Sequence, residues 1–183
     1  MEGAQQRGPD LRLSLWAKLD TLRTTQSKGD FMTQTKIAVI GGSGIYDING
    51  LEGAEWLTVE SPWGPPSDAI LTGTLDGVEM AFLPRHGRGH RLLPSEVPYR
   101  ANIHGLKQLG VTHVLAVSAV GIMKEHISPG EMVVPDQLFD RTKDVRPSTF
   151  FGDGIVGHVS MADPFCDELR QVVAKSARDS DPL

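Results

Sequence analysis

The chain has 183 residues, 39% of them hydrophobic and 22% charged, which is the balance of an ordinary globular domain. Its formal net charge of −5 argues against a general affinity for DNA or RNA, because phosphate backbones require a basic surface. A single cysteine, Cys166, rules out a disulfide framework and favours a reducing compartment, so we expect a cytoplasmic protein. No apolar run approaches the roughly 18 residues of a transmembrane helix, and we expect no membrane partner.

The beginning of the chain differs from the rest. Several leucines between Leu11 and Leu22 fall on one helical face, but their flanks are polar and contain glycine, as in disordered tails. We therefore expect residues 1–31 to be an extension, either disordered or a short helix. Residues 32–183 are expected to form the compact part of the chain.

Strand and helix signals then alternate. Strands are predicted at 37–40, 55–60, 69–75, 78–83, 111–120 and 131–135. The dipeptide Asp76-Gly77 between two of them is a strong hairpin signal. Helices are predicted over 95–109 and from an N-cap at Asp163 toward Lys175. This alternation, together with the hairpin, predicts the α/β class with a mixed central β-sheet flanked by helices.

A glycine loop, GGSG at 41–44, follows the first predicted strand. The backbone N–H groups of such a loop can approach an anion closely, and the Ser43 hydroxyl lies among them. The dinucleotide-binding pattern requires a small residue where this chain has Asp47, and the phosphate-loop pattern that ends in lysine is absent. By itself the loop is explained equally well by a small-anion site and by a plain structural turn.

A basic cluster follows the strand predicted at 78–83. Its five side chains are Arg85, His86, Arg88, His90 and Arg91. A solvated charge run is the ordinary interpretation, but two interspersed glycines allow these side chains to converge on one point. Two of the histidines stand four residues apart, as zinc ligands can, but no acidic third ligand is near and no metal is expected. Arginine with histidine at a strand end suits a phosphate-sized anion.

A third segment, VSAVG at 117–121, ends a predicted buried strand in a hydroxyl, small residues and a glycine. The Ser118 hydroxyl and nearby N–H groups can serve a ligand, although a strand that simply leaves the core has the same pattern. In open α/β sheets ligands bind beyond the carboxyl ends of the strands, so we expect the three segments to share one anion site. None of them offers a strong base or nucleophile, which indicates that the anion itself reacts.

Eight blocks of the sequence occur in the same order in methylthioadenosine phosphorylases, a branch of the trimeric purine nucleoside phosphorylase superfamily. The blocks are GGSGIYD, SPWGPPSDAI, PRHGRGH, PYRANIHGLKQLGVTHV, SAVG, ISPGEMVVPDQLFDRT, RPSTFF and HVSMADPFC. The chain resembles this family from residue 36 to about residue 175. The resemblance implies a nucleoside phosphorylase-like sheet. Because members of the family continue past the last residue of this chain, we expect residues 32–183 to be the N-terminal portion of that domain, incomplete at its C-terminal end.

The resemblance implies phosphorolysis of 5′-methylthioadenosine to adenine and 5-methylthioribose-1-phosphate, with inorganic phosphate as co-substrate and no cofactor. The phosphate-binding residues that it implies are Ser43, Arg85, His86, Ser118 and Ala119. It also implies that Val120 and Gly121 line the base side and that His158 reaches the pocket of a neighbouring subunit. A homo-oligomer, either a trimer or a dimer of trimers, follows from the same resemblance.

The catalytic residues stay unassigned, because the family's purine-binding aspartate motif does not occur in this sequence. Base choice depends on that motif, so phosphorolysis of methylthioinosine or of 6-oxopurine nucleosides is an alternative. An inactive fragment that acts as an anion-binding or subunit-interaction module is a second alternative. A dinucleotide-binding oxidoreductase is disfavoured by Asp47. We expect the 183 residues alone to aggregate readily and to show little or no phosphorolysis.

Overall fold

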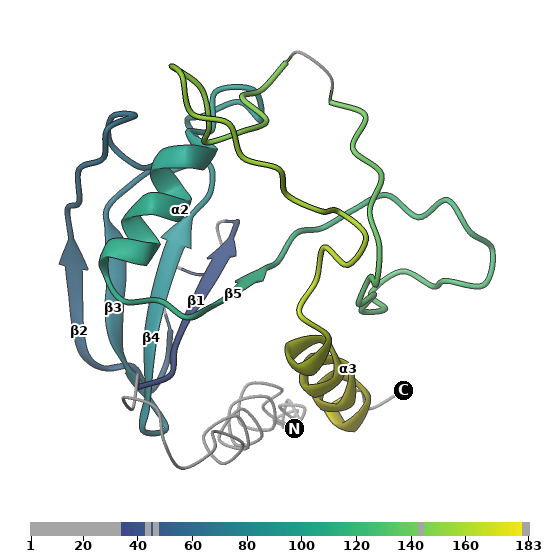
Figure 1. The fold of residues 1–183 in the computed structure, drawn as a ribbon. Helices are drawn as coiled ribbons and strands as arrows, with labels where there is room; N and C mark the ends of the chain where they lie inside the picture. The colour runs from purple at the N-terminus through teal and green to yellow at the C-terminus, as the bar shows by residue number, and fades with distance from the viewer. Residues whose placement is uncertain (1–33, 43–44, 46–47, 143–144, 181–183) are drawn as a thin grey trace, which may run out of the picture.

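The computed structural model describes residues 34–42, 45, 48–142 and 145–180, and the expected extension over 1–31 lies outside them. Within the described part, five strands and two helices follow one another along the chain (Figure 1). They are β1 (Lys36–Gly41), β2 (Glu52–Leu57), β3 (Ile70–Leu75), β4 (Val78–Pro84), α2 (Tyr99–Gln108), β5 (His113–Ala116) and α3 (Asp167–Ser180).

The strands form one mixed sheet in the order β2-β3-β4-β1-β5. β1 lies between β4 and β5 and is parallel to both, whereas β3 is antiparallel to its neighbours β2 and β4. The expected mixed central sheet is therefore confirmed. Because β1, β4 and β5 run in the same direction, their carboxyl ends meet at one edge of the sheet (Figure 1).

The predicted hairpin joins β3 to β4. Leu75 pairs with Val78 across the turn, and the two residues between them have φ of +48° at Asp76 and +78° at Gly77. Positive φ at both central positions is the geometry of the tight turn that matches the twist of paired strands. Glycine adopts it without steric cost, so the dipeptide alone predicts this turn correctly.

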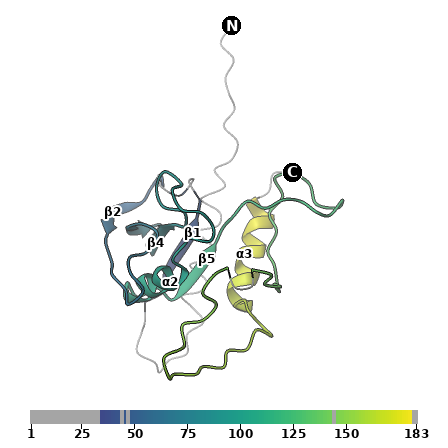
Figure 2. The same ribbon diagram turned by 90° about the horizontal axis from the view of Figure 1, so that it is seen from above.

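Hydrophobic side chains are buried on both faces of the sheet, and each face carries a helix. One buried cluster includes Ile37, Val39, Met80 and Phe82 from the strands and Leu169 from α3. The other includes Ala38, Ile40, Ala81 and Leu83 from the strands and Leu106 from α2. Successive residues of a strand point to opposite faces, so consecutive apolar residues in β1 and β4 supply both clusters. The helices flank the sheet as predicted, and Figure 2 shows them on different sides of β1 and β5.

Three strand predictions need correction. The strand expected over 55–60 lies three residues earlier, at Glu52–Leu57. The strand expected over 111–120 is only four residues long, β5 at His113–Ala116, and the strand expected over 131–135 does not form. Both sequences are rich in β-branched residues, but a strand also needs a neighbour with which to exchange hydrogen bonds. Among the described residues, only β1 pairs with β5, and no strand lies beside 131–135.

Both helices begin later than predicted. α2 begins at Tyr99 after Pro98, because a proline disfavours helical geometry in the residue before it. In α3 the first hydrogen bond runs from the Arg170 N–H to the Cys166 carbonyl at 2.9 Å, so the helix is capped at Cys166, three residues beyond the expected N-cap at Asp163. Asp167 and Glu168 then occupy the first turn, where their charge favours the helix dipole.

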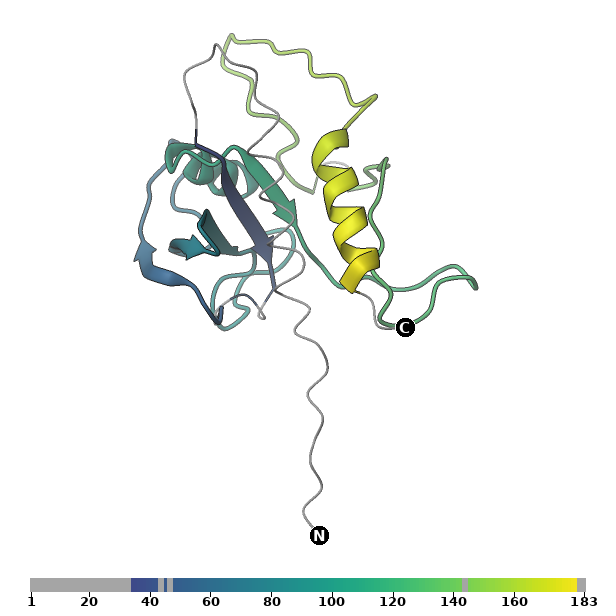
Figure 3. The same ribbon diagram turned by 90° about the horizontal axis from the view of Figure 1, so that it is seen from below.

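Between β5 and α3 the chain runs through residues 117–142 and 145–166, which we call the extended segment. Apart from a single bridge between Gly152 and Ile155, its residues form neither helix nor strand. Figure 3 shows it leaving the sheet after β5 and returning to α3 in wide loops. No helix in the described part of the chain is both long and apolar enough to cross a membrane.

Candidate functional site

The carboxyl ends of three strands are tied together by backbone hydrogen bonds. The Arg85 N–H donates to the Gly41 carbonyl at 2.9 Å, which extends the pairing of β4 with β1 beyond β4. On the other side, the Val117 N–H donates to the Ile40 carbonyl at 2.8 Å and extends the pairing of β5 with β1. The start of the basic cluster and the start of VSAVG therefore flank the last residues of β1.

The Arg85 side chain crosses the end of β1. Its Nη1 donates to the Val117 carbonyl at 3.5 Å, and its Nε donates to His86 Nε2 at 3.3 Å. Ser118 and Ala119 follow Val117 directly and are exposed. The structure thus brings Arg85 and His86 next to the segment that carries Ser118, while Ser43 lies outside the described residues.

The other arginines of the basic cluster anchor its loop. Arg88 forms an ion pair with Asp68 at 2.9 Å, and its backbone N–H donates to the same carboxylate at 2.6 Å. Arg91 Nη2 donates to the Ser67 carbonyl at 2.6 Å. Partial burial acts to raise the pKa of Asp68, but hydrogen bonds from Arg88 and from the Ala69 N–H outweigh it and lower the pKa. The cluster therefore separates into anchoring side chains and side chains at the strand ends.

A buried polar pair connects this anchor to α2. The Asn102 side chain accepts from the Ser67 N–H at 2.7 Å and donates to the Ser67 hydroxyl at 2.9 Å, and both residues are almost completely buried. Buried amides need such partners, because an unpaired one costs about 1–3 kcal/mol. Neither residue was predicted from the sequence as a site residue, although both lie in blocks shared with the phosphorylases.

The two histidines of the basic cluster stack on each other. The ring centroids of His86 and His90 are 4.4 Å apart, with an interplanar angle of 22°. His86 Nδ1 lies 2.9 Å from the Leu92 carbonyl oxygen, so neither ring nitrogen of His86 is without a partner. In the described residues, no group of three or more histidine, cysteine or acidic side chains is placed to hold a metal ion.

The residues predicted for the nucleoside side belong to the extended segment. Val120 is 77% exposed, and Gly121 and His158 are exposed as well. Within the described part of the chain, no hydrogen bond, ion pair or ring contact joins any of them to Arg85 or His86. Of the predicted site, the structure therefore shows Arg85 and His86 beside the segment that begins at Val117, and no bond from them to the predicted base side.

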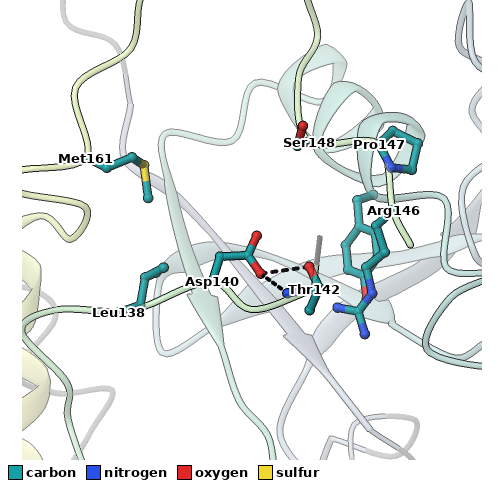
Figure 4. A pocket seen from close by; sticks show the side chains of 8 residues that line it. Leu138, Asp140, Thr142, Arg146, Pro147, Ser148 and Met161 are labelled. Atoms are coloured by element: carbon teal, nitrogen blue, oxygen red, sulfur yellow. Dashed lines mark hydrogen bonds between the residues drawn. The ribbon is translucent and has the colours of Figure 1, made fainter. Parts of the chain in front are cut away.

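A separate pocket of about 330 Å³ lies between the start of α2 and the extended segment (Figure 4). Its lining residues are Tyr99, Leu138, Asp140, Thr142, Arg146, Pro147, Ser148 and Met161. Asp140 accepts from the Thr142 N–H at 2.8 Å and from its hydroxyl at 2.7 Å, and these bonds, with the charge of Arg146, lower the pKa of Asp140. The Arg146 guanidinium lies 5.2 Å from the Tyr99 ring centroid. This pocket shares no residue with the predicted phosphate site.

The fold and the strand-end site define an α/β protein that carries Arg85 and His86 at the end of its parallel strands. Residues 36–182 match the model of the phosphorylase superfamily, and the chain belongs to that superfamily. Its relatives include the S-methyl-5′-thioadenosine phosphorylases of Geobacter sulfurreducens, 56% identical over 144 residues, and Cereibacter sphaeroides, 58% identical over 145 residues. Each alignment covers 79% of this chain and 50% of the relative.

Solved structures agree with the family. A methylthioadenosine phosphorylase from an Antarctic soil metagenomic library is 56% identical, with a TM-score of 0.72 over 76% of this chain and 48% of its own. The methylthioadenosine phosphorylase of Schistosoma mansoni in complex with adenine is 42% identical, with a TM-score of 0.75 over 81% of this chain and 55% of its own. The nucleoside phosphorylase-like fold is thereby confirmed. The chain spans about half the length of the curated relatives it matches.

Proposed function

We propose that this chain forms the phosphate side of an enzyme that cleaves 5′-methylthioadenosine with inorganic phosphate. The products are adenine and 5-methylthioribose-1-phosphate. The observation that carries the proposal is the position of Arg85, which joins the ends of β4 and β5 across the end of β1. Relatives named as S-methyl-5′-thioadenosine phosphorylases, at more than half sequence identity, support the choice of nucleoside.

The chemistry of phosphorolysis suits such a site. Cleavage of an N-glycosidic bond develops positive charge on the sugar, as in other glycoside reactions. A phosphate dianion held below the ring stabilises this charge and then bonds to C1′ as the nucleophile. The chain therefore supplies position and preorganised charge, through Arg85 and the Ser43 and Ser118 hydroxyls, and needs neither a cofactor nor a metal.

The wider setting is part of the same proposal. We infer a homo-oligomer with threefold symmetry, a trimer or a dimer of trimers, in which His158 reaches the pocket of a neighbouring subunit. Its exposed position in the extended segment supports this role. A cytoplasmic location is supported by the single cysteine, Cys166, which is exposed and free.

Phosphate binding by the purified chain is the first test. We expect titration calorimetry with inorganic phosphate to show binding that Arg85→Ala weakens more than Ser43→Ala does. A charge-assisted hydrogen bond is worth about 1.5–3 kcal/mol and a neutral one about 1 kcal/mol, so the difference should be readily measured. Lys124→Ala, in the exposed extended segment, is the control for losing one positive charge.

Turnover is the second test. The purified chain is mixed with 5′-methylthioadenosine, with methylthioinosine or with inosine, each with and without phosphate. We expect little or no release of adenine, and any release to depend on phosphate, because no carboxyl group of this chain is assigned to protonate the purine and a missing general acid costs about 10²–10⁴ in rate. Release that does not need phosphate, or faster release from the 6-oxopurine nucleosides, contradicts the proposal. Phosphate binding without any release agrees with the proposal and also with the anion-binding module, whereas a chain that binds no phosphate contradicts both.

A further inference from the structure

The contacts of the His86 ring define where its hydrogen lies. Nδ1 is 2.9 Å from the Leu92 carbonyl oxygen, which can only accept, so Nδ1 must carry the hydrogen. The Arg85 Nε–H donates to His86 Nε2 at 3.3 Å, and a guanidinium can only donate, so Nε2 must present its lone pair. Only the neutral Nδ1–H tautomer satisfies both hydrogen bonds at once.

In this tautomer the ring has no N–H left for an anion. His86 instead fixes the guanidinium of Arg85, whose Nη1 reaches the Val117 carbonyl at 3.5 Å. Most of the N–H donors of Arg85 stay outside these two bonds, and a guanidinium presents them in a rigid plane that matches phosphate oxygens. The direct donor to a phosphate at the strand ends is then Arg85.

His90 covers one face of the same ring. The two rings are nearly parallel, with centroids 4.4 Å apart. The His90 backbone has φ of +54°, in the left-handed region that residues other than glycine rarely adopt, and its N–H closes a turn on the Gly87 carbonyl at 3.0 Å. With this backbone conformation the His90 ring lies on the His86 ring.

We propose that His90 is a positioning residue of the phosphate site. Its ring holds the His86 imidazole in the orientation in which Nε2 accepts from Arg85, so that Arg85 rather than His86 donates to the bound phosphate. The identity of the anion rests on the proposed function. Within that function, His86 has an acceptor role toward Arg85, and His90 is an additional residue of the phosphate site.

The tautomer of His86 is the first readout, and it does not depend on turnover. The chain is labelled with ¹⁵N-histidine and studied by long-range ¹H–¹⁵N correlation spectra at about pH 8, above the usual imidazole pKa of about 6.5. We expect His86 to be the Nδ1–H tautomer. His90→Asn removes the ring but tolerates positive φ, and should mix the two tautomers of His86. His90→Phe keeps a flat ring and should restore the parent spectrum.

Phosphate affinity is the second readout, with His126→Asn in the exposed extended segment as the matched control. Stacked aromatic pairs have modest energies, so we expect His90→Asn to raise the Kd for inorganic phosphate about threefold to tenfold. The His90→Phe and His126→Asn chains should have a Kd for phosphate within about twofold of the parent value. Losing a stacked aromatic pair would change this Kd by more than that. A merely structural role for His90 would shift the unfolding midpoint without mixing the His86 tautomers.

Two results would overturn the inference: His86 observed as the Nε2–H tautomer, or a His90→Asn chain with unchanged tautomer and unchanged phosphate affinity. A parent chain that binds no phosphate contradicts the proposed function and not the arrangement of the rings. In that case the spectra of the parent, His90→Asn and His90→Phe chains still decide whether His90 positions His86.

Discussion

The sheet region, residues 36–116, and the extended segment contain the same kinds of hydrophobic residue. The sheet region buries many of these side chains, whereas the extended segment exposes most of them. Phe82 is 2% exposed in β4, whereas Phe139 is 86% exposed in the extended segment. Met80 is fully buried and Met123 is 93% exposed. Apolar composition alone therefore does not produce a core. A strand buries its side chains only where a neighbouring strand or helix covers them.

The consequence for the extended segment is a large exposed apolar surface. Contiguous apolar patches beyond a few hundred Å² are rare on monomeric proteins and mark interaction or aggregation sites. β5 adds an edge of the sheet that no described strand covers, and such edges promote pairing between chains. The expectation that the purified chain aggregates readily has this physical basis and stays a prediction.

The largest expected difference between the two regions is the cost of truncating a phenylalanine. Phe82→Ala should lower the free energy of unfolding by about 3–5 kcal/mol, because it leaves a cavity in the core. Phe139→Ala should change it by less than about 0.5 kcal/mol, because that side chain is in solvent. Urea unfolding followed by circular dichroism measures both. If Phe82→Ala does not fold, Phe82→Leu should still fold, with a smaller loss of the free energy of unfolding. Equal losses for the substitutions at positions 82 and 139 would refute the comparison.

The next difference is acid sensitivity at the anchor of the basic loop. The pKa of Asp68 is lower in the folded chain than its ordinary value of 3.8, so its contribution is complete above that pH and is lost as the pH falls through and below it. Asp68→Asn should cost about 1–2 kcal/mol at neutral pH, since Arg88 is half exposed and its ion pair is partly screened.

The measurement for Asp68 is the free energy of unfolding at several pH values. Between about pH 5 and pH 3 the Asp68→Asn chain should lose less stability than the parent, because the carboxyl that titrates at the anchor is gone. Glu125→Gln in the extended segment removes the same charge from an exposed position and should follow the parent. Identical pH dependence in all three chains would show that the anchor contributes nothing.

The smallest expected difference concerns two glycines. Gly77 has φ of +78° in the hairpin, whereas Gly121 in the extended segment has no positive φ and no atom within 4 Å of an added Cβ. Gly77→Ala should cost about 1 kcal/mol from backbone strain. Gly121→Ala should change the free energy of unfolding by less than about 0.5 kcal/mol. Thermal unfolding of the two variants measures both changes. A loss of stability in Gly121→Ala larger than that in Gly77→Ala would mean that contacts order the segment around Gly121.

The sequence by itself determined those features of the fold that short-range patterns control. The buried strands β1 and β4, the Asp76-Gly77 turn and the mixed α/β sheet follow from apolar runs and turn chemistry, which act between residues close in the chain. The family resemblance, which rests on ordered blocks, was equally visible there. Even so, the strand predicted over 131–135 failed, because pairing needs a partner strand that local sequence does not reveal.

Only the tertiary structure decided which side chains of the basic cluster anchor its loop and which lie at the strand ends. Residue type and spacing alone do not distinguish Arg85 from Arg88, although the family resemblance implies a phosphate contact for Arg85. The fold places Arg88 against Asp68 and turns Arg85 across the end of β1 toward Val117. It also lays His90 on His86 through a left-handed backbone. These roles depend on partners far apart in the chain, because charge and hydrogen bonding act through space and only folding sets those distances.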